Sequence, residues 1–210
     1  MPVETLAALR GLDVPVSFIV GNGDREVLEC ARGVETEWYR QAQDSWRVPV
    51  KWNAEQLERD DVEHIAAWPN TCRVSIEGTG NVLFCHATPR NDTDCFTSLT
   101  HEKVLMPLFV GLDADVVVCG HTHMQFDRIV GGVRVVNAGS VGMPFAAPGA
   151  YWLRLGPEVE FRRTDFDVVA AAARIRATKF PQADAFAESN VLHPPSEASM
   201  LRVFTEGGLK

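Results

Sequence analysis

The sequence predicts an α/β fold, and three observations lead to that prediction. Short apolar runs at 82–85 and 116–119 are typical of strands buried within a sheet. Glycine-containing turns at 78–80, 131–132 and 156–157 separate pairs of strand-like runs, which indicates hairpins. Segments with helical periodicity lie before, between and after them. The chain has 210 residues, 46% of them hydrophobic, which suits one domain with a sizeable core.

The N-terminal part is predicted to alternate between helix, strand and turn. We expect a helix over 3–12, then a strand over 14–20 because that segment is rich in β-branched residues. It runs into the turn Gly21-Asn22-Gly23-Asp24, where Asp24 would cap a helix that begins near Arg25. The remaining predicted elements are helices over 26–43, 53–67, 100–109 and 166–179 (capped by Asp165), and strands over 73–77, 81–85, 116–119, 125–130, 133–136, 150–155 and 159–163.

The formal net charge of -8 argues against an extended nucleic-acid surface or an anionic-membrane surface. A small phosphate site is still compatible with this charge if a bound metal supplies positive charge. No apolar run approaches the roughly 20 residues of a membrane span, and no signal peptide is visible. The five cysteines form no Cys-x-x-Cys pair, and Cys85 and Cys119 end apolar runs, as small buried residues do. We therefore expect a reduced, cytoplasmic protein without a disulfide framework.

Three strand ends carry side chains that could bind a metal. His121 and His123 follow Gly120 and a buried strand, His86 follows a second apolar strand, and Asn22 follows the strand over 14–20. Neutral imidazole is the commonest metal ligand, and α/β proteins place ligands at the carboxyl ends of strands. The alternative is that the histidines are structural and that the Asn22 turn is an ordinary loop.

Other polar residues are expected to have no role in chemistry. Asp92 and Asp94 lie in the polar loop 91–98 and are expected to be solvated. His64 is expected on the surface or in packing, and His101 is expected to be exposed.

Taken together, these motifs resemble the calcineurin-like metallophosphoesterase superfamily. The resemblance rests on Gly21-Asn22-Gly23-Asp24, on His86 after a strand, on Gly120-His121-Thr122-His123, and on Asn137-Ala138-Gly139-Ser140. Their order and spacing agree with the small bacterial YfcE-like or diadenosine-tetraphosphatase-related members. The resemblance implies a four-layer αββα sandwich of two mixed sheets, with a core over 1–164 and a C-terminal helical extension over 165–210 packed on the same domain.

The resemblance also implies a site and an activity. By motif match, Asn22, His86 and His121 would bind one divalent metal and His123 a second, with Mn, Fe, Ni or Zn as the expected ions. Asp24 and His86 would serve catalysis, and Asn22 and Arg25 would contact substrate. The implied reaction is hydrolysis of a phosphodiester or phosphomonoester by a metal-activated water. The implied partner is a small phosphoester, with a nucleotide and a homo-oligomer both left open.

Two departures from the family pattern shape these expectations. The N-terminal Asp-x-His and Gly-Asp motifs are absent, so the visible ligands are neutral. The resemblance implies two divalent metals, and binding of only one by this chain is left open. We therefore expect an N-terminally shortened gene product or gene model that lacks its first strands, or a second chain that supplies them. Gly23 stands where larger phosphatases have a histidine that protonates the leaving group, so a substrate with a good leaving group is favoured. The alternative function is an inactive, truncated scaffold that acts in binding.

Overall fold

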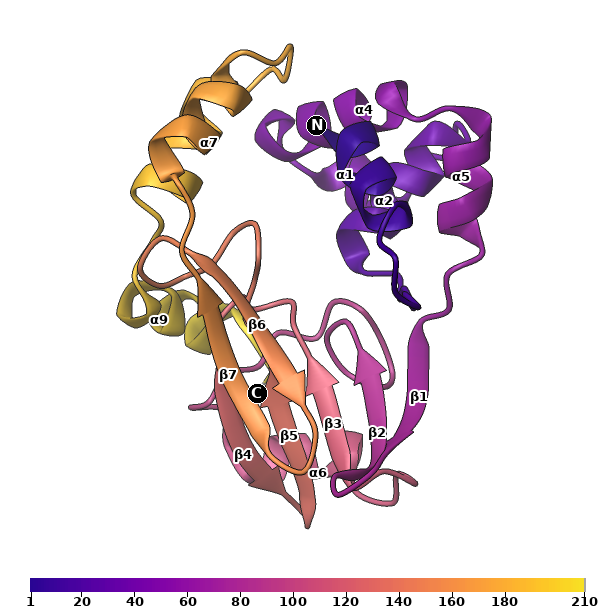
Figure 1. The fold of residues 1–210 in the computed structure, drawn as a ribbon, viewed down its shortest axis with the longest axis vertical. Coiled ribbons are helices and arrows are strands. Elements are labelled where there is room, and N and C mark those ends of the chain that lie inside the picture. The colour runs from indigo at the N-terminus through magenta and orange to yellow at the C-terminus, as the bar shows by residue number, and fades with distance from the viewer. Residues whose placement is uncertain (210) are drawn as a thin grey trace.

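The chain forms two sheets with helices on both sides, which confirms the predicted fold class. The computed structural model describes residues 1–209. Its larger sheet is mixed, with strand order β1-β2-β3-β5-β4, and a separate antiparallel pair, β6-β7, forms the second sheet (Figure 1). The strands are β1 (Thr71–Ile76), β2 (Gly80–Cys85), β3 (Val116–Cys119), β4 (Phe126–Val130), β5 (Val133–Asn137), β6 (Ala150–Leu155) and β7 (Val159–Thr164).

The two faces of the larger sheet bury different apolar layers. On one face, Leu83 and Val117 pack with Phe109 of α6 (Glu102–Phe109). On the other, Val116 and Val118 belong to a cluster that includes residues of the β6-β7 hairpin. All four residues of β3 are buried, which explains why its sequence is a continuous apolar run and does not alternate.

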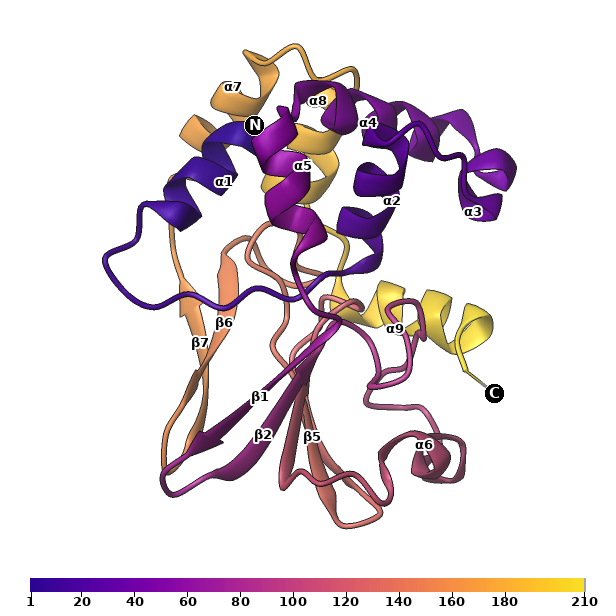
Figure 2. The same cartoon turned by 90° about the vertical axis from the view of Figure 1, so that its right-hand side faces the viewer.

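A group of helices lies beyond the end of the sheet at which β2 and β3 finish (Figures 1 and 2). It comprises α1 (Pro2–Arg10), α2 (Asn22–Ala31), α3 (Glu37–Gln41), α4 (Asp44–Gln56) and α5 (Arg59–Ala66). The C-terminal part comprises α7 (Val168–Arg176), α8 (Ala183–Phe186), a π-helix (Ala187–Leu192) and α9 (Glu197–Gly207). It contacts α4 through the ring of Phe180, 5.3 Å from that of Trp52, and through a hydrogen bond from Gln182 to the Ser45 carbonyl.

The prediction of a strand over 14–20 is wrong. The segment forms no strand, and the Val20 N–H donates to the Pro69 carbonyl. Val14 is 62% exposed and Val16 is 39% exposed. β-branched residues favour extended backbone, but a strand also needs a neighbour to pair with, and within residues 1–209 no strand pairs with this segment.

Several helix boundaries also differ from the prediction, and local backbone signals explain each one. The helix expected over 26–43 is interrupted after Ala31, where Gly33 has a φ of 75° and Thr36 caps α3. The helix expected over 53–67 is two helices, because Leu57 is extended between α4 and α5. Asp167, and not Asp165, caps α7 by accepting the Ala170 N–H at 2.9 Å.

Candidate metal centre

Three side chains from distant parts of the chain meet at one point. β2 ends at Cys85 and is followed by His86. β3 ends at Cys119 and is followed by Gly120 and His121, and α2 begins with Asn22. Asn22 Oδ1 lies 2.9 Å from His86 Nε2 and 3.1 Å from His121 Nδ1, and the two nitrogens are 3.2 Å apart. The structure therefore brings together three of the four residues that the sequence predicts as metal ligands.

The protons of these side chains cannot satisfy all three contacts. Asn22 Oδ1 is an acceptor, and each imidazole nitrogen carries at most one hydrogen. If His86 Nε2 and His121 Nδ1 both carry a hydrogen, both can donate to Asn22 Oδ1, but the two N–H groups then oppose each other across their 3.2 Å contact. If only one of them carries a hydrogen, the other nitrogen and Asn22 Oδ1 face each other with lone pairs alone. A cation would use the lone pairs of all three atoms at once.

The spacing of the three atoms fits a common coordination geometry. In an octahedral site with bonds of about 2.1 Å, adjacent ligand atoms lie about 3.0 Å apart. The observed separations of 2.9, 3.1 and 3.2 Å agree with that value. The donor set is entirely neutral, however, and within residues 1–209 no group of three or more His, Cys, Asp or Glu side chains is arranged to hold a metal ion. The arrangement thus depends on the amide of Asn22.

Burial keeps these imidazoles neutral, as ligands must be. Burial and the nearby His121 lower the pKa of His86 to about 4, against a partial opposing effect of Asp92. Burial likewise lowers the pKa of His121, which Asp92 and a backbone hydrogen bond at Thr93 raise in part. Neutral imidazoles at pH 7 offer a free lone pair to a metal.

A buried asparagine holds the turn that carries His121. Asn137, at the end of β5, is fully buried and donates to the Gly120 carbonyl at 2.5 Å and to Thr122 Oγ1 at 3.2 Å. Its Oδ1 accepts the Gly139 N–H at 2.9 Å. These bonds hold a backbone in which His121 has a φ of 62°, a left-handed value that is uncommon outside glycine. Asn137 therefore positions His121.

His123 is placed differently from the other three predicted ligands. Its φ is 59°, and its ring stacks on Phe145 at 5.1 Å. Its Nδ1 is buried and has no hydrogen-bond partner among the described residues, which is unusual for a buried polar atom. Among those residues, no hydrogen bond joins it to the Asn22, His86 and His121 cluster, but its imidazole lies near enough to contribute to the lowered pKa of His86. The orphaned nitrogen is nevertheless suited to a second cation.

Backbone constraints at the start of α2 bring Asn22 to His86. A Cβ atom at Gly21 would lie 2.6 Å from His86 Nδ1, so only glycine permits this approach. Asp24 does not cap the helix as predicted. Gly21 occupies the N-cap position, and Asp24, the third helical residue, accepts the Gly21 N–H at 2.9 Å. Burial raises the pKa of Asp24, and that hydrogen bond lowers it in part.

The loop carboxylates are not solvated, contrary to expectation. Asp92 accepts two hydrogen bonds from Arg25, at 2.8 and 3.2 Å. Asp94 is 8% exposed and accepts bonds from Arg90, at 2.6 and 2.9 Å, and from Thr88 at 2.7 Å. The sequence separates Arg25 from Asp92 by 67 positions, so no local signal could have paired them.

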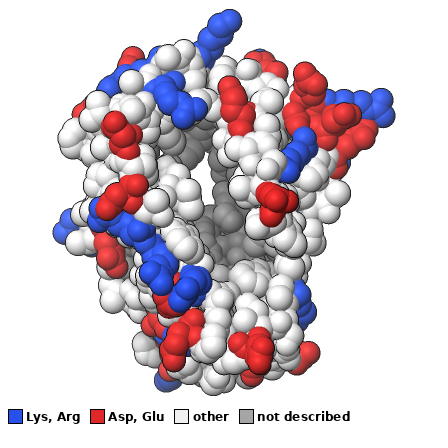
Figure 3. Space-filling view, in the orientation of Figure 1, with Lys and Arg blue, Asp and Glu red and all other residues white. Residues whose placement is uncertain are grey.

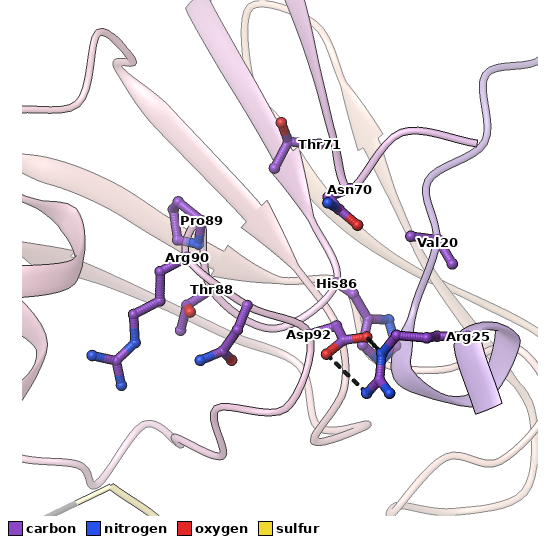
Figure 4. Close-up of a pocket in the computed structure, with 10 residues that line it drawn as sticks. Val20, Arg25, Asn70, Thr71, His86, Thr88, Pro89, Arg90 and Asp92 are labelled. Atoms are coloured by element: carbon purple, nitrogen blue, oxygen red, sulfur yellow. Dashed lines mark hydrogen bonds and ion pairs between the residues drawn. The ribbon is translucent and has the colours of Figure 1, made fainter. Parts of the chain in front are cut away.

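Of the four side chains in these two pairs, Arg25, Asp92 and Arg90 line a cavity of about 270 Å³ beside His86 (Figure 4). Dashed bonds join Arg25 of α2 to Asp92 of the loop after His86, and Arg90 lies on that loop as well. The face in Figure 3 is hollowed near its centre, with basic and acidic side chains interspersed around the hollow. The predicted substrate contact Arg25 therefore does line a cavity beside the cluster, with its guanidinium already paired.

Cys95 is another neighbour that the sequence did not indicate. Its Sγ lies 3.3 Å from His121 Nε2, the ring nitrogen that faces away from the cluster. A histidine that uses Nδ1 toward a metal carries its proton on Nε2, where a second partner fixes the tautomer. Cys95 occupies the position of that partner.

Comparison with known proteins places the chain in a family. Residues 2–155 match the calcineurin-like phosphoesterase superfamily domain, and the chain belongs to that family. A hypothetical protein of Pyrococcus horikoshii OT3 has a similar structure, with a TM-score of 0.76 and 17% identity over 93% of this chain and 81% of that one. A metallophosphoesterase from Sphaerobacter thermophilus gives a TM-score of 0.65 and 19% identity over 90% and 82%. At these identities the likeness concerns the fold. Curated protein sequences give no match.

Proposed function

We propose that this protein hydrolyses small phosphoesters with the help of a divalent cation held by Asn22, His86 and His121. The convergence of three lone pairs within 3.2 Å of one another is the observation that carries the proposal. Membership of the calcineurin-like phosphoesterase family supports the reaction class. His123, with its unpartnered Nδ1, is the proposed ligand of a second cation.

The chain's own residues have separate tasks in this proposal. A bound divalent cation would polarise the phosphoryl group and lower the pKa of a water. Asp24 is a positioning residue, because its carboxylate holds the Gly21 backbone against which His86 lies. His86 is the proposed ligand because its Nε2 lies 2.9 Å from Asn22 Oδ1 and 3.2 Å from His121 Nδ1, and its lowered pKa keeps the imidazole neutral at neutral pH. Gly23 offers no acid for the leaving group, so substrates whose leaving group needs no protonation are favoured.

Metal content and turnover together test the proposal. The full chain is purified with Mn²⁺ and assayed with p-nitrophenyl phosphate and bis-p-nitrophenyl phosphate, and bound metal is measured by elemental analysis. His121→Ala should lose bound Mn²⁺ and turnover together. His193→Ala is the matched control, because that imidazole is 74% exposed and pairs with Glu188. No metal-dependent turnover in the wild-type chain would contradict the proposed function.

A second candidate function is binding without hydrolysis. The neutral donor set favours it, because carboxylates that would offset two divalent charges are not among the residues at the cluster. In that case His121→Ala would lower metal content, while neither the wild type nor the variant would cleave a phosphoester. Wild-type turnover that His121→Ala abolishes would exclude this alternative.

The proposal extends to the subgroup of the family and to the cellular compartment. The order of the four motifs favours the small bacterial YfcE-like subgroup. All five cysteines are free, which favours a reducing compartment such as the cytoplasm. None of the helices within residues 1–209 has the length and apolar character to cross a membrane.

A further inference from the structure

We infer that Asp92 is a specificity-determining residue that biases the cavity beside His86 toward phosphodiesters and against phosphomonoesters. The inference rests on the proposed function, because it takes the cavity to be where the substrate's phosphoryl group and its substituent bind. It concerns the charge that the cavity presents, which neither the family nor the motifs specify.

The first observation is that the cavity's cations are already neutralised. Arg25 and Arg90 both line the cavity, and arginine forks are well suited to phosphate oxygens. Each guanidinium is instead held by two hydrogen bonds to an aspartate, Arg25 by Asp92 and Arg90 by Asp94. Arg25 gives a further bond to the buried carboxylate of Glu26. Among residues 1–209, both arginines that line this cavity are therefore paired before a phosphoryl group enters it.

The second observation is that Asp92 itself is part of the cavity wall. Its side chain is 20% exposed and lines the cavity together with His86. Asp94, by contrast, is 8% exposed, binds Thr88 as well as Arg90, and is not part of the wall. Asp92 is thus the carboxylate that an incoming anion meets first.

These charges discriminate between two classes of ester. A phosphomonoester carries a charge of about -1.5 to -2 near pH 7, whereas a phosphodiester keeps a single negative charge. The extra charge of a monoester would gain most from a free Arg25 and lose most from a nearby Asp92. A diester loses less, and the cavity beside the cluster has room for its second substituent.

The experiment compares two anions that differ by one methyl group. Monomethyl phosphate and dimethyl phosphate are titrated into the full chain at pH 8 with fixed Mn²⁺, and each dissociation constant is measured by calorimetry. Asp92→Asn removes the carboxylate that holds Nε and Nη2 of Arg25, while Nη1 stays bonded to Glu26. It should shift the ratio of the two affinities toward monomethyl phosphate by about tenfold. Arg25→Gln should shift it about as far in the opposite direction, because Asp92 would then be unpaired.

The matched control is Asp127→Asn. Arg134 and Asp127 form a similar pair on β4 and β5, with the arginine side chain 37% exposed, as that of Arg25 is, but neither residue lines the cavity. This variant should leave the ratio unchanged. Bound Mn²⁺ is measured for every variant, so that a ratio change due to loss of the metal is recognised.

The outcomes separate the inference from the proposed function. An unchanged ratio in both Asp92→Asn and Arg25→Gln, or an equal change in Asp127→Asn, would overturn the inference. Opposite shifts in the two cavity variants support it, and if one of them does not fold, the direction of the other decides. If the shifts appear but no variant or wild-type chain cleaves bis-p-nitrophenyl phosphate, the discrimination stands and the hydrolytic function fails.

Discussion

The larger sheet and the N-terminal helical group are held together to different degrees. In the sheet, Val117 and Val135 are fully buried, and Phe109 of α6 is also fully buried against one face. In the N-terminal group, Leu6, Leu28, Ala54 and Ile65 are buried, but Trp46 is 62% exposed, and the segment over 14–20 has no pairing strand within residues 1–209. The sheet therefore has a larger and more fully buried core than the helical group.

The candidate metal centre lies across the boundary between these two regions. His86 and His121 follow strands of the sheet and are held by backbone bonds such as that from the Gly120 N–H to the His86 carbonyl, at 2.8 Å. Asn22 comes from the helical group, which reaches the sheet side through Arg25 and Asp92. Two ligands are thus fixed by the core, and the third depends on how well the helical group stays in place.

The largest contrast in stability should come from large-to-small substitutions in the two regions. Phe109→Ala removes a fully buried ring that contacts Phe96 at 5.5 Å, and should lower the free energy of unfolding by about 3–5 kcal/mol. Trp46→Ala should change it by less than about 0.5 kcal/mol, because that ring is largely solvated. Denaturant titration measures both, and equal losses would show that the two regions are equally well packed.

The second contrast compares the reactivity at pH 8 of two thiols of the sheet, Cys85 and Cys119, between the native and the unfolded chain. Burial raises the pKa of Cys85 from 9.0 to about 12, which lowers its thiolate population about a thousandfold. Cys119 is fully buried and its pKa is raised well above the ordinary value. A raised pKa leaves a thiol protonated and unreactive until the pH passes that value. Iodoacetamide and mass spectrometry should therefore show both thiols unmodified in the native chain and modified in guanidinium. Rapid native labelling of Cys85 would contradict this.

The third contrast separates two asparagines with different surroundings. Asn137→Ala removes two hydrogen bonds to the His121 turn and a third to the Gly139 N–H, and should cost about 1–3 kcal/mol of stability. It should also weaken Mn²⁺ binding about tenfold or more, as loss of a residue that orients a ligand does. Asn53→Ala, which removes one bond to the Pro49 carbonyl within α4, is the control and should leave Mn²⁺ binding unchanged. Equal effects on Mn²⁺ binding would deny Asn137 its positioning role.

The smallest expected effect lies on the surface of α5. Arg59 and Glu63 form an ion pair at 2.8 Å, with side chains 89% and 62% exposed. Glu63→Gln should lower the free energy of unfolding by about 0.5 kcal/mol or less, because solvent screens the pair. A loss above about 1 kcal/mol in denaturant titration would mean that the helical group is more tightly organised than its burial indicates.

The sheet could be predicted from the sequence because its signals are local. Apolar runs, glycine turns and the residues that follow them identified β2, β3 and the β4-β5 hairpin, and placed His86 and His121 at strand ends. The prediction of a strand over 14–20 was wrong because β-branched residues favour extended backbone, whereas a strand also needs a second strand elsewhere in the chain to pair with. The pairs Arg25–Asp92 and His121–Cys95 were missed for the same reason, since they depend on tertiary placement.

At His121 and His123 the backbone is left-handed, so the residue that would be most stable there differs from the residue that can bind a metal. Glycine in either place would relieve about 1–2 kcal/mol of steric cost, yet it would leave no imidazole. A variant library screened for heat resistance alone should therefore accumulate glycine at 121 and 123. One screened for retained metal should keep histidine there and recover its stability through substitutions elsewhere.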